Sequence, residues 1–281
     1  MRSLPCPPRD QVRNDLITAL EVYQARGIQR GYPVTPAELD SIIALYDAYD
    51  TCNGSVDEAL KGLTIADALR AAVHDGYEFT QYGRKLAAIR VQLMHGVELC
   101  PICGISPPRE LDHHLPRSVF NPLAIYVRNL VPICHECNHR KGAAVPVNVT
   151  QRSVHPYLEA LPDIPFLRAD ISIENDALLV RYAIDQDVAL PELMKQRLAF
   201  EMHKLRLNER YASEINMYLT SHTTALSMCF QSGGAAGVES FLNDQAEVES
   251  AAFHRNHWRP VLLVALALHQ EFCNGGFLYV L

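Results

Sequence analysis

The chain lacks several features that would assign a protein quickly. It has no run of about 18 uninterrupted apolar residues, the length that a membrane-spanning helix needs. Its start, MRSLPCPPRDQVRND, lacks the apolar core of a signal peptide. Charged residues make up 20% and hydrophobic residues 48%, as in ordinary globular proteins. We therefore expect a cytoplasmic protein without a membrane segment, and 281 residues suffice for one large domain or two small ones.

Positive charge is also scarce, since the net charge is −7, and this at first argues against a nucleic-acid partner. The distribution of charge changes that interpretation. Residues 84–152 hold nine Lys/Arg and four Asp/Glu, a local balance of +5 that leaves −12 for the rest. A basic surface on an acidic body can still bind phosphate, with a smaller salt dependence than an all-basic protein. We expect DNA to bind mainly through residues 84–152, and the acidic remainder to restrain activity by repelling it.

Cysteine, by contrast, is present in a pattern. Two of the eight cysteines form CPIC at 100–103, and two more form CHEC at 134–137. A disulfide framework is unusual in a reducing compartment and in a chain this long, so paired cysteines there indicate metal ligands. Four thiolates suit tetrahedral Zn²⁺ and leave no position for water or substrate. The sequence predicts structural zinc at Cys100, Cys103, Cys134 and Cys137, and it predicts that the scattered Cys6, Cys52, Cys229 and Cys273 are small buried apolar residues.

Polar residues that suit hydrolytic chemistry lie between and beside the two cysteine pairs. The segment LDHHLPRS occupies 111–118, NLVP occupies 129–132, and Asn138 and Lys141-Gly142 follow the second pair. Together these motifs resemble the HNH endonuclease family, the ββα-metal nucleases, in the version with two zinc knuckles. The resemblance covers residues 98–142, about a sixth of the chain.

The resemblance implies roles for four side chains. His113 would be the general base, because an imidazole titrates near neutral pH. Asp112 and Asn138 would bind the catalytic Mg²⁺ or Mn²⁺ through oxygen. Asn138 stands where the family often has His, which favours a hard metal over a soft one. Asn129 would hydrogen-bond across the loop and hold the base in its orientation.

The neighbouring residues leave alternatives open. If His113 and His114 both lie on a strand, they point to opposite faces, so His114 has a structural or DNA-facing role. His135 and His139 beside the second cysteine pair would be exposed or contact phosphate. Arg117, Arg140 and Lys141 would be DNA phosphate contacts or simply solvated charges.

The rest of the chain predicts an α+β fold that is mainly helical, with a central zinc-stabilised ββα core and a β-hairpin after it. Residues 1–97 form a helical N-terminal region, 98–145 the nuclease core, and 146–281 a C-terminal region of hairpin plus helices. Thr35-Pro36-Ala37-Glu38 predicts a capped helix start, and a later helix over 80–95 would group Arg84, Lys85 and Arg90. The runs 166–173 and 178–184 predict the hairpin, and Ser232-Gly233-Gly234 a helix break.

These observations predict a metal-dependent DNA endonuclease that nicks one strand or cuts both. The family serves mobile elements, restriction and antiphage defence, often beside an ATPase or sensor partner, and helical flanks suit such docking. A rival interpretation is a non-catalytic zinc-ribbon module that binds nucleic acid or protein. An RNA-cutting or junction-resolving enzyme is a third. The sequence does not set the oligomeric state, the target or the trigger.

Overall fold

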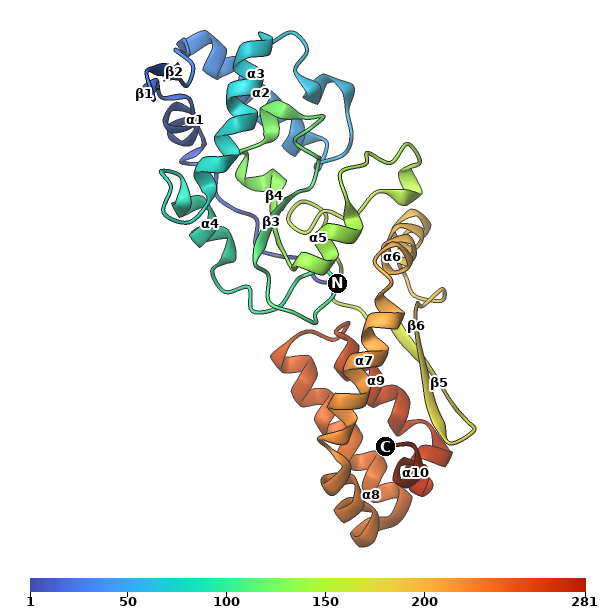
Figure 1. The fold of residues 1–281 in the computed structure, drawn as a ribbon. Helices are drawn as coiled ribbons and strands as arrows, with labels where there is room; N and C mark the ends of the chain where they lie inside the picture. Colours follow the sequence, from blue (N-terminus) through green and yellow to red (C-terminus); the bar gives the residue numbers. More distant parts are fainter.

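The computed structural model describes all 281 residues and shows two halves, each built around its own core. The first core contains 22 buried residues drawn from Leu16 to Leu130. The second contains 31, drawn from Cys100 to Phe277. In Figure 1 the blue-to-green part of the chain forms the upper half, and the orange and red helices form the lower half.

The upper half consists of helices with one small, largely exposed hairpin at its edge. Its elements are α1 (Val12–Leu20), β1 (Tyr23–Ala25), β2 (Ile28–Arg30), α2 (Pro36–Thr51), α3 (Asp67–Gly76) and α4 (Ala87–Met94). The predicted helix start at Thr35 is confirmed. Its hydroxyl accepts from the Glu38 backbone N–H at 3.3 Å, and the Thr35 backbone N–H donates to the Glu38 carboxylate at 2.8 Å. These reciprocal bonds satisfy two of the N–H groups that a helix start leaves free.

Two features of this half differ from the prediction. The β1–β2 hairpin turns at Arg26 and Gly27, both with positive φ, as a tight two-residue hairpin turn requires. The helix predicted over 80–95 begins only at Ala87, because the chain first makes a turn in which Gly83 has a φ of +74°. Arg90 is buried and bonds to Gln81 and to the carbonyl oxygens of Thr80 and Arg109, so its expected place on a shared basic face was wrong.

The central segment forms two strands and a helix. Strand β3 (Glu110–His113) pairs antiparallel with β4 (Leu130–Ile133), and α5 (His135–Lys141) follows β4 directly. The register places Asp112 opposite Val131 and His113 opposite Leu130. The side chains of Leu111 and Leu130 pack into the upper core, whereas Ile133 and the cysteines pack into the lower one. The segment therefore lies where the two halves meet.

The lower half begins with the predicted hairpin and continues in helices. Its elements are β5 (Leu167–Glu174), β6 (Ala177–Ile184), α6 (Glu192–Lys204), α7 (Leu207–Thr220), α8 (Thr223–Ala252), α9 (Trp258–Ala267) and α10 (Phe277–Val280). The hairpin is confirmed and turns at Asn175 and Asp176, both with positive φ. The backbone of α8 leaves helical geometry at Gly234, within the Ser-Gly-Gly break that the sequence predicted.

The apolar C-terminal segment packs inside this half. Trp258 is 2% exposed, and the buried face of α9 contacts α8 and β5. No single helix is long and apolar enough to cross a membrane. The pair formed by α9 and residues Phe272–Val280 reaches that length and composition only across an 84° bend.

Candidate functional site

Four cysteines meet in the interior, as predicted. The sulfur atoms of Cys100, Cys103, Cys134 and Cys137 all lie within 4.8 Å of one another, and all four residues are buried. The Sγ atoms of Cys103 and Cys134 are 3.7 Å apart. A tetrahedron with a Zn–S bond of about 2.3 Å has edges of about 3.8 Å, so this spacing fits zinc. The cluster is consistent with a structural zinc in a zinc-knuckle module.

Local backbone geometry presents the sulfur atoms to one another. The first cysteine pair lies in a turn closed by the Gly104 N–H, which donates to the Cys100 carbonyl at 2.9 Å. Gly104 has a φ of +65°, and a Cβ there would lie 2.7 Å from the His257 ring. Of the second pair, Cys134 follows β4 as the N-cap of α5, and Cys137 lies in the first turn of that helix. A metal in this cluster would bind the four sulfur atoms as thiolates.

Side chains from the C-terminal helices hold this cluster, and the sequence prediction missed them. Arg210 Nη1 donates to Cys137 Sγ at 3.2 Å, and the Tyr211 hydroxyl donates to the Cys103 carbonyl at 3.0 Å. His257 Nε2 and Trp258 Nε1 lie 2.9 Å and 3.3 Å from the Gly104 carbonyl oxygen. These residues are more than 70 positions from their partners, so spacing in the sequence carries no signal of the contact.

The other cysteines mostly depart from the prediction. Cys273 is buried, but Cys6 is exposed and Cys52 and Cys229 are half-buried. Cys6 lies between prolines near the start of the chain, outside both cores. The expectation of four buried apolar cysteines was therefore wrong for three of them.

An open cleft of about 650 Å³ lies beside β3 and α5. Asp112, His113 and Asn138 all line it, so the structure brings three of the four proposed catalytic residues together. Further lining residues include His74, Tyr77, Glu110, Arg117, His135 and His139. The cleft therefore combines carboxylates, imidazoles and a guanidinium on one surface.

His113 is held in one orientation. Its Nε2 lies 2.9 Å from the Ala124 carbonyl oxygen, and its ring centre lies 4.5 Å from that of Tyr77. A carbonyl only accepts hydrogen bonds, so Nε2 carries the proton and Nδ1 is the free acceptor of the neutral ring. Burial lowers the pKa of His113 to about 3, and the nearby Arg117 and Lys141 charges act in the same direction. The imidazole is therefore neutral at physiological pH.

Asp112 is paired with a cation. Its Oδ2 lies 2.6 Å from Lys141 Nζ, and the same ammonium donates to the His113 carbonyl oxygen at 2.8 Å. Both side chains are largely buried, 14% exposed for Asp112 and 12% for Lys141. Burial raises the pKa of Asp112 and the Lys141 charge opposes that rise. The carboxylate thus faces a positive charge in a poorly solvated position.

Asn138 is bonded to a carboxylate that the sequence prediction missed. Its Nδ2 donates to Glu110 Oε2 at 2.5 Å, and Glu110 Oε1 lies 2.7 Å from His135 Nδ1. Although burial opposes it, the hydrogen bonds from Asn138 and His135 lower the pKa of Glu110. Glu110 and Asp112 are two positions apart on β3 and therefore share a face. The alternation of a strand could have indicated Glu110 from the sequence.

Asn129 is fully buried and lies behind the cleft, not on it. Its Oδ1 accepts from the Leu115 N–H at 2.8 Å and from the Tyr49 hydroxyl at 3.1 Å. Its Nδ2 donates to the carbonyl oxygens of Leu115 at 3.0 Å and Leu123 at 3.2 Å. One amide therefore ties both ends of the loop between β3 and β4, and that loop carries the carbonyl of Ala124 that holds His113.

Each of the three basic residues predicted to contact phosphate has a carboxylate partner. Arg117 lies 3.3 Å from Glu78 and packs over the Tyr77 ring, and Arg140 bonds to Glu136 at 2.6 Å. Lys141 bonds to Asp112 as described. Of these, Arg117 is on the cleft, and Arg140 is not among its lining residues. His114 does not line this cleft and packs against His155, with ring centres 4.2 Å apart and ring planes tilted by 37°.

Comparison with known proteins adds one relative. No family model matches the chain, and no solved structure matches it. Protein ea31 of Escherichia phage lambda is 26% identical over 201 residues, which cover 65% of this chain and 66% of the phage protein. The chain thus spans just under two thirds of that relative's length. The name of the phage protein describes no activity.

Proposed function

We propose that this protein is a metal-dependent endonuclease of the HNH type that hydrolyses DNA phosphodiester bonds. One observation carries the proposal. An antiparallel strand pair is followed at once by a helix, and Asp112, His113 and Asn138 from these elements line one open cleft beside a four-cysteine cluster. A zinc scaffold alone needs no oriented, neutral imidazole beside a carboxylate.

His113 supplies the base in this proposal. Its Nε2 proton is committed to the Ala124 carbonyl, so Nδ1 takes the proton of the attacking water. The buried ring is neutral at physiological pH, so Nδ1 can accept a proton, and its low pKa makes it a weak base. Tyr77 packs on the ring, and Asn129 fixes the loop that carries the Ala124 carbonyl.

Asp112 and Asn138 fit a hard divalent cation. A carboxylate oxygen and an amide oxygen are ligands suited to Mg²⁺ or Mn²⁺, and Asp112 already attracts one cation, the Lys141 ammonium. Such an ion would neutralise charge on the phosphate as the phosphodiester is cleaved. Asn138 donates through Nδ2 to Glu110, which directs its amide nitrogen away and leaves its oxygen for a cation. Lys141 would then pair with phosphate in place of Asp112.

The biological setting in this proposal is phage biology or bacterial defence. The relationship to a lambda protein and the large helical flanks support it, and an ATPase or sensor is a suitable partner for those flanks. Four reduced cysteines suit the cytoplasm. The acidic surface outside residues 84–152 would keep the isolated chain weakly active until a partner or a particular DNA is present.

One observation favours the alternative of a non-catalytic zinc-ribbon module. Arg117, Arg140 and Lys141 are each already paired with a carboxylate, and Lys141 covers Asp112. In that case the ion pairs would serve structure, and the cleft would bind protein or nucleic acid without cutting.

Supercoiled plasmid distinguishes the two functions. The protein is incubated with plasmid in Mg²⁺, in Mn²⁺ and without divalent metal, beside His113→Ala and the control His139→Ala. His139 lines the same cleft but is exposed and makes no hydrogen bond. We expect nicked or linear product that requires metal and is lost in His113→Ala but kept in His139→Ala. Equal product from the two variants, or cutting without metal, would count against the proposal.

A further inference from the structure

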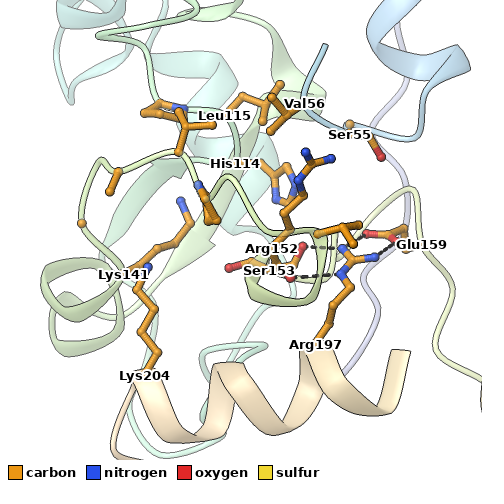
Figure 2. Close-up of a pocket in the computed structure, with 17 residues that line it drawn as sticks. Ser55, Val56, His114, Leu115, Lys141, Arg152, Ser153, Glu159, Arg197 and Lys204 are labelled. Carbon is orange, nitrogen blue, oxygen red and sulfur yellow. Dashed lines mark hydrogen bonds and ion pairs between the residues drawn. The ribbon is translucent and has the colours of Figure 1, made fainter. Parts of the chain in front are cut away.

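A second, more enclosed pocket adjoins the cleft near Pro116 and Gly142. It is lined by the loop after α5, by α6 and by the loop that carries His114 and Leu115. Pro116 and Gly142 line both the pocket and the cleft, so the two are neighbours. Lys141 lines only the pocket. Figure 2 shows side chains of Lys141, Arg152 and Lys204 directed into this hollow.

The pocket carries an excess of positive charge. Four of its lining residues are basic, namely Lys141, Arg152, Arg197 and Lys204, and Glu159 is its one carboxylate. Glu159 is used by Arg197, which binds both of its oxygens at 2.5 Å and 2.7 Å. No carboxylate lies within ion-pair distance of Arg152 or Lys204. In a chain of net charge −7, unpaired cations gathered in one hollow indicate an anionic ligand.

Arg197 and Arg152 have different roles in the pocket. Arg197 donates Nε to the Arg152 carbonyl at 3.0 Å and Nη2 to the Ser153 carbonyl at 2.6 Å, so it fixes the backbone that carries Arg152. The Nε of Arg152 is buried and has no hydrogen-bond partner. Since Nε is closed to solvent, a ligand in the pocket would be bound by the terminal N–H groups of Arg152, which make no hydrogen bond to the protein.

Lys204 and His114 supply further donors. Burial lowers the pKa of Lys204, and the neighbouring Lys141 charge acts in the same direction, whereas Glu201 and Asp112 act in the opposite one. His114 also lines the pocket and makes no hydrogen bond through its ring nitrogens. Guanidinium, ammonium and imidazole groups around one hollow are the set that binds phosphate in proteins.

The size of the pocket limits which anionic group it can hold. Its volume is about 60 Å³, room for about four water-sized groups and so for a single phosphate group. We propose that this pocket binds a terminal phosphate group, carried by the end of a nucleic-acid strand or by a small phosphorylated molecule. The proposal concerns binding alone and stands whether or not His113 supports cleavage.

Calorimetric titration tests this phosphate binding. No divalent metal is added, so that cleavage does not contribute to the measured heat. Inorganic phosphate is titrated into the full-length protein, into Arg152→Gln and Lys204→Gln, and into Arg181→Gln as a control. Arg181 is exposed on β6 and lies outside the pocket. We expect one equivalent of phosphate to bind, with affinity reduced about tenfold in each pocket variant and unchanged in the control. The Arg152 guanidinium has no protein partner, so Arg152→Gln should melt at the same temperature as the unaltered chain.

A second titration identifies the source of the phosphate. A dinucleotide with a 5′-phosphate is compared with the same dinucleotide lacking it. If the phosphorylated dinucleotide binds more tightly than inorganic phosphate, the phosphate comes from the end of a nucleic-acid strand. If the two bind equally, it comes from a small phosphorylated molecule. Absence of saturable phosphate binding, or equal affinity in Arg152→Gln and Arg181→Gln, would overturn the proposal.

Discussion

Removal of one zinc ligand should destabilise the half of the molecule that contains the C-terminal helices. Cys137 is fully buried, and its sulfur accepts from Arg210 of α7. The cluster shares a core with Trp258, whose indole N–H reaches the Gly104 carbonyl in the first cysteine turn. The change Cys137→Ala therefore loosens a metal site on which two distant helices rest.

The expected loss of stability in Cys137→Ala follows from the free energy that the metal contributes to folding. Structural zinc contributes an apparent free energy of about 10 kcal/mol or more, and a whole domain is stable by about 5–15 kcal/mol. Losing one of four thiolates weakens this contribution without abolishing it, so we expect Cys137→Ala to cost several kcal/mol. Cys273→Ala is the matched control, because Cys273 is 4% exposed in the same core but lies outside the cluster. Its loss removes one sulfur atom and should cost about 1 kcal/mol.

Trp258 is the only tryptophan, so its fluorescence reports this half alone. Denaturant unfolding followed by Trp258 emission, with zinc counted by native mass spectrometry, compares the two variants. We expect one zinc per chain in Cys273→Ala. We expect Cys137→Ala to unfold at a much lower denaturant concentration than Cys273→Ala, with Trp258 emission at longer wavelength. If Cys137→Ala unfolded within about 1 kcal/mol of Cys273→Ala with unchanged emission, the metal would not support this core.

Three further outcomes are expected. Asn129→Ala should lower the free energy of unfolding by about 3 kcal/mol or more in chemical denaturation, because buried groups of Leu115 and Leu123 lose their partners. The free energy of unfolding should fall as the pH drops below 6.5, because burial lowers the folded-state pKa of His155 and of His257 to about 3. Denaturant unfolding at pH 7, 5 and 4 should show a loss of about 1.4 kcal/mol per pH unit for each of these histidines. The cleavage rate should not change near pH 6.5, since the pKa of His113 is about 3. An inflection of the rate at that pH would contradict the assignment of His113 as a buried base.

The sequence anticipated the features that depend on nearby residues. The Thr35–Glu38 capping bonds, the hairpin at 166–184 and the meeting of four cysteines follow from short spacings. It did not anticipate features that depend on distant partners. Arg210 reaches Cys137 across 73 positions, and no periodic pattern marks such a pair.

Turn geometry accounts for the other differences. Glycines with positive φ, such as Gly27 and Gly83, created a hairpin and shortened a helix in a region whose apolar pattern predicted continuous helices. Glu110 was within reach of sequence reasoning, because it lies two positions before Asp112 on a strand. Arg152 and Lys204 were not, since only the folded chain brings the loop after α5 against α6.

The position of the central segment between the two cores has a mechanical consequence. Asp112 stands on a strand whose Leu111 belongs to the upper core, and Asn138 stands on a helix whose Cys137 belongs to the lower core. Asn138 donates to Glu110 of the same strand, so the proposed ligand oxygens of Asp112 and Asn138 are held relative to each other within this segment. A partner that binds the distal helices would act on them only through Ile133 and the four cysteines, which join the segment to the lower core.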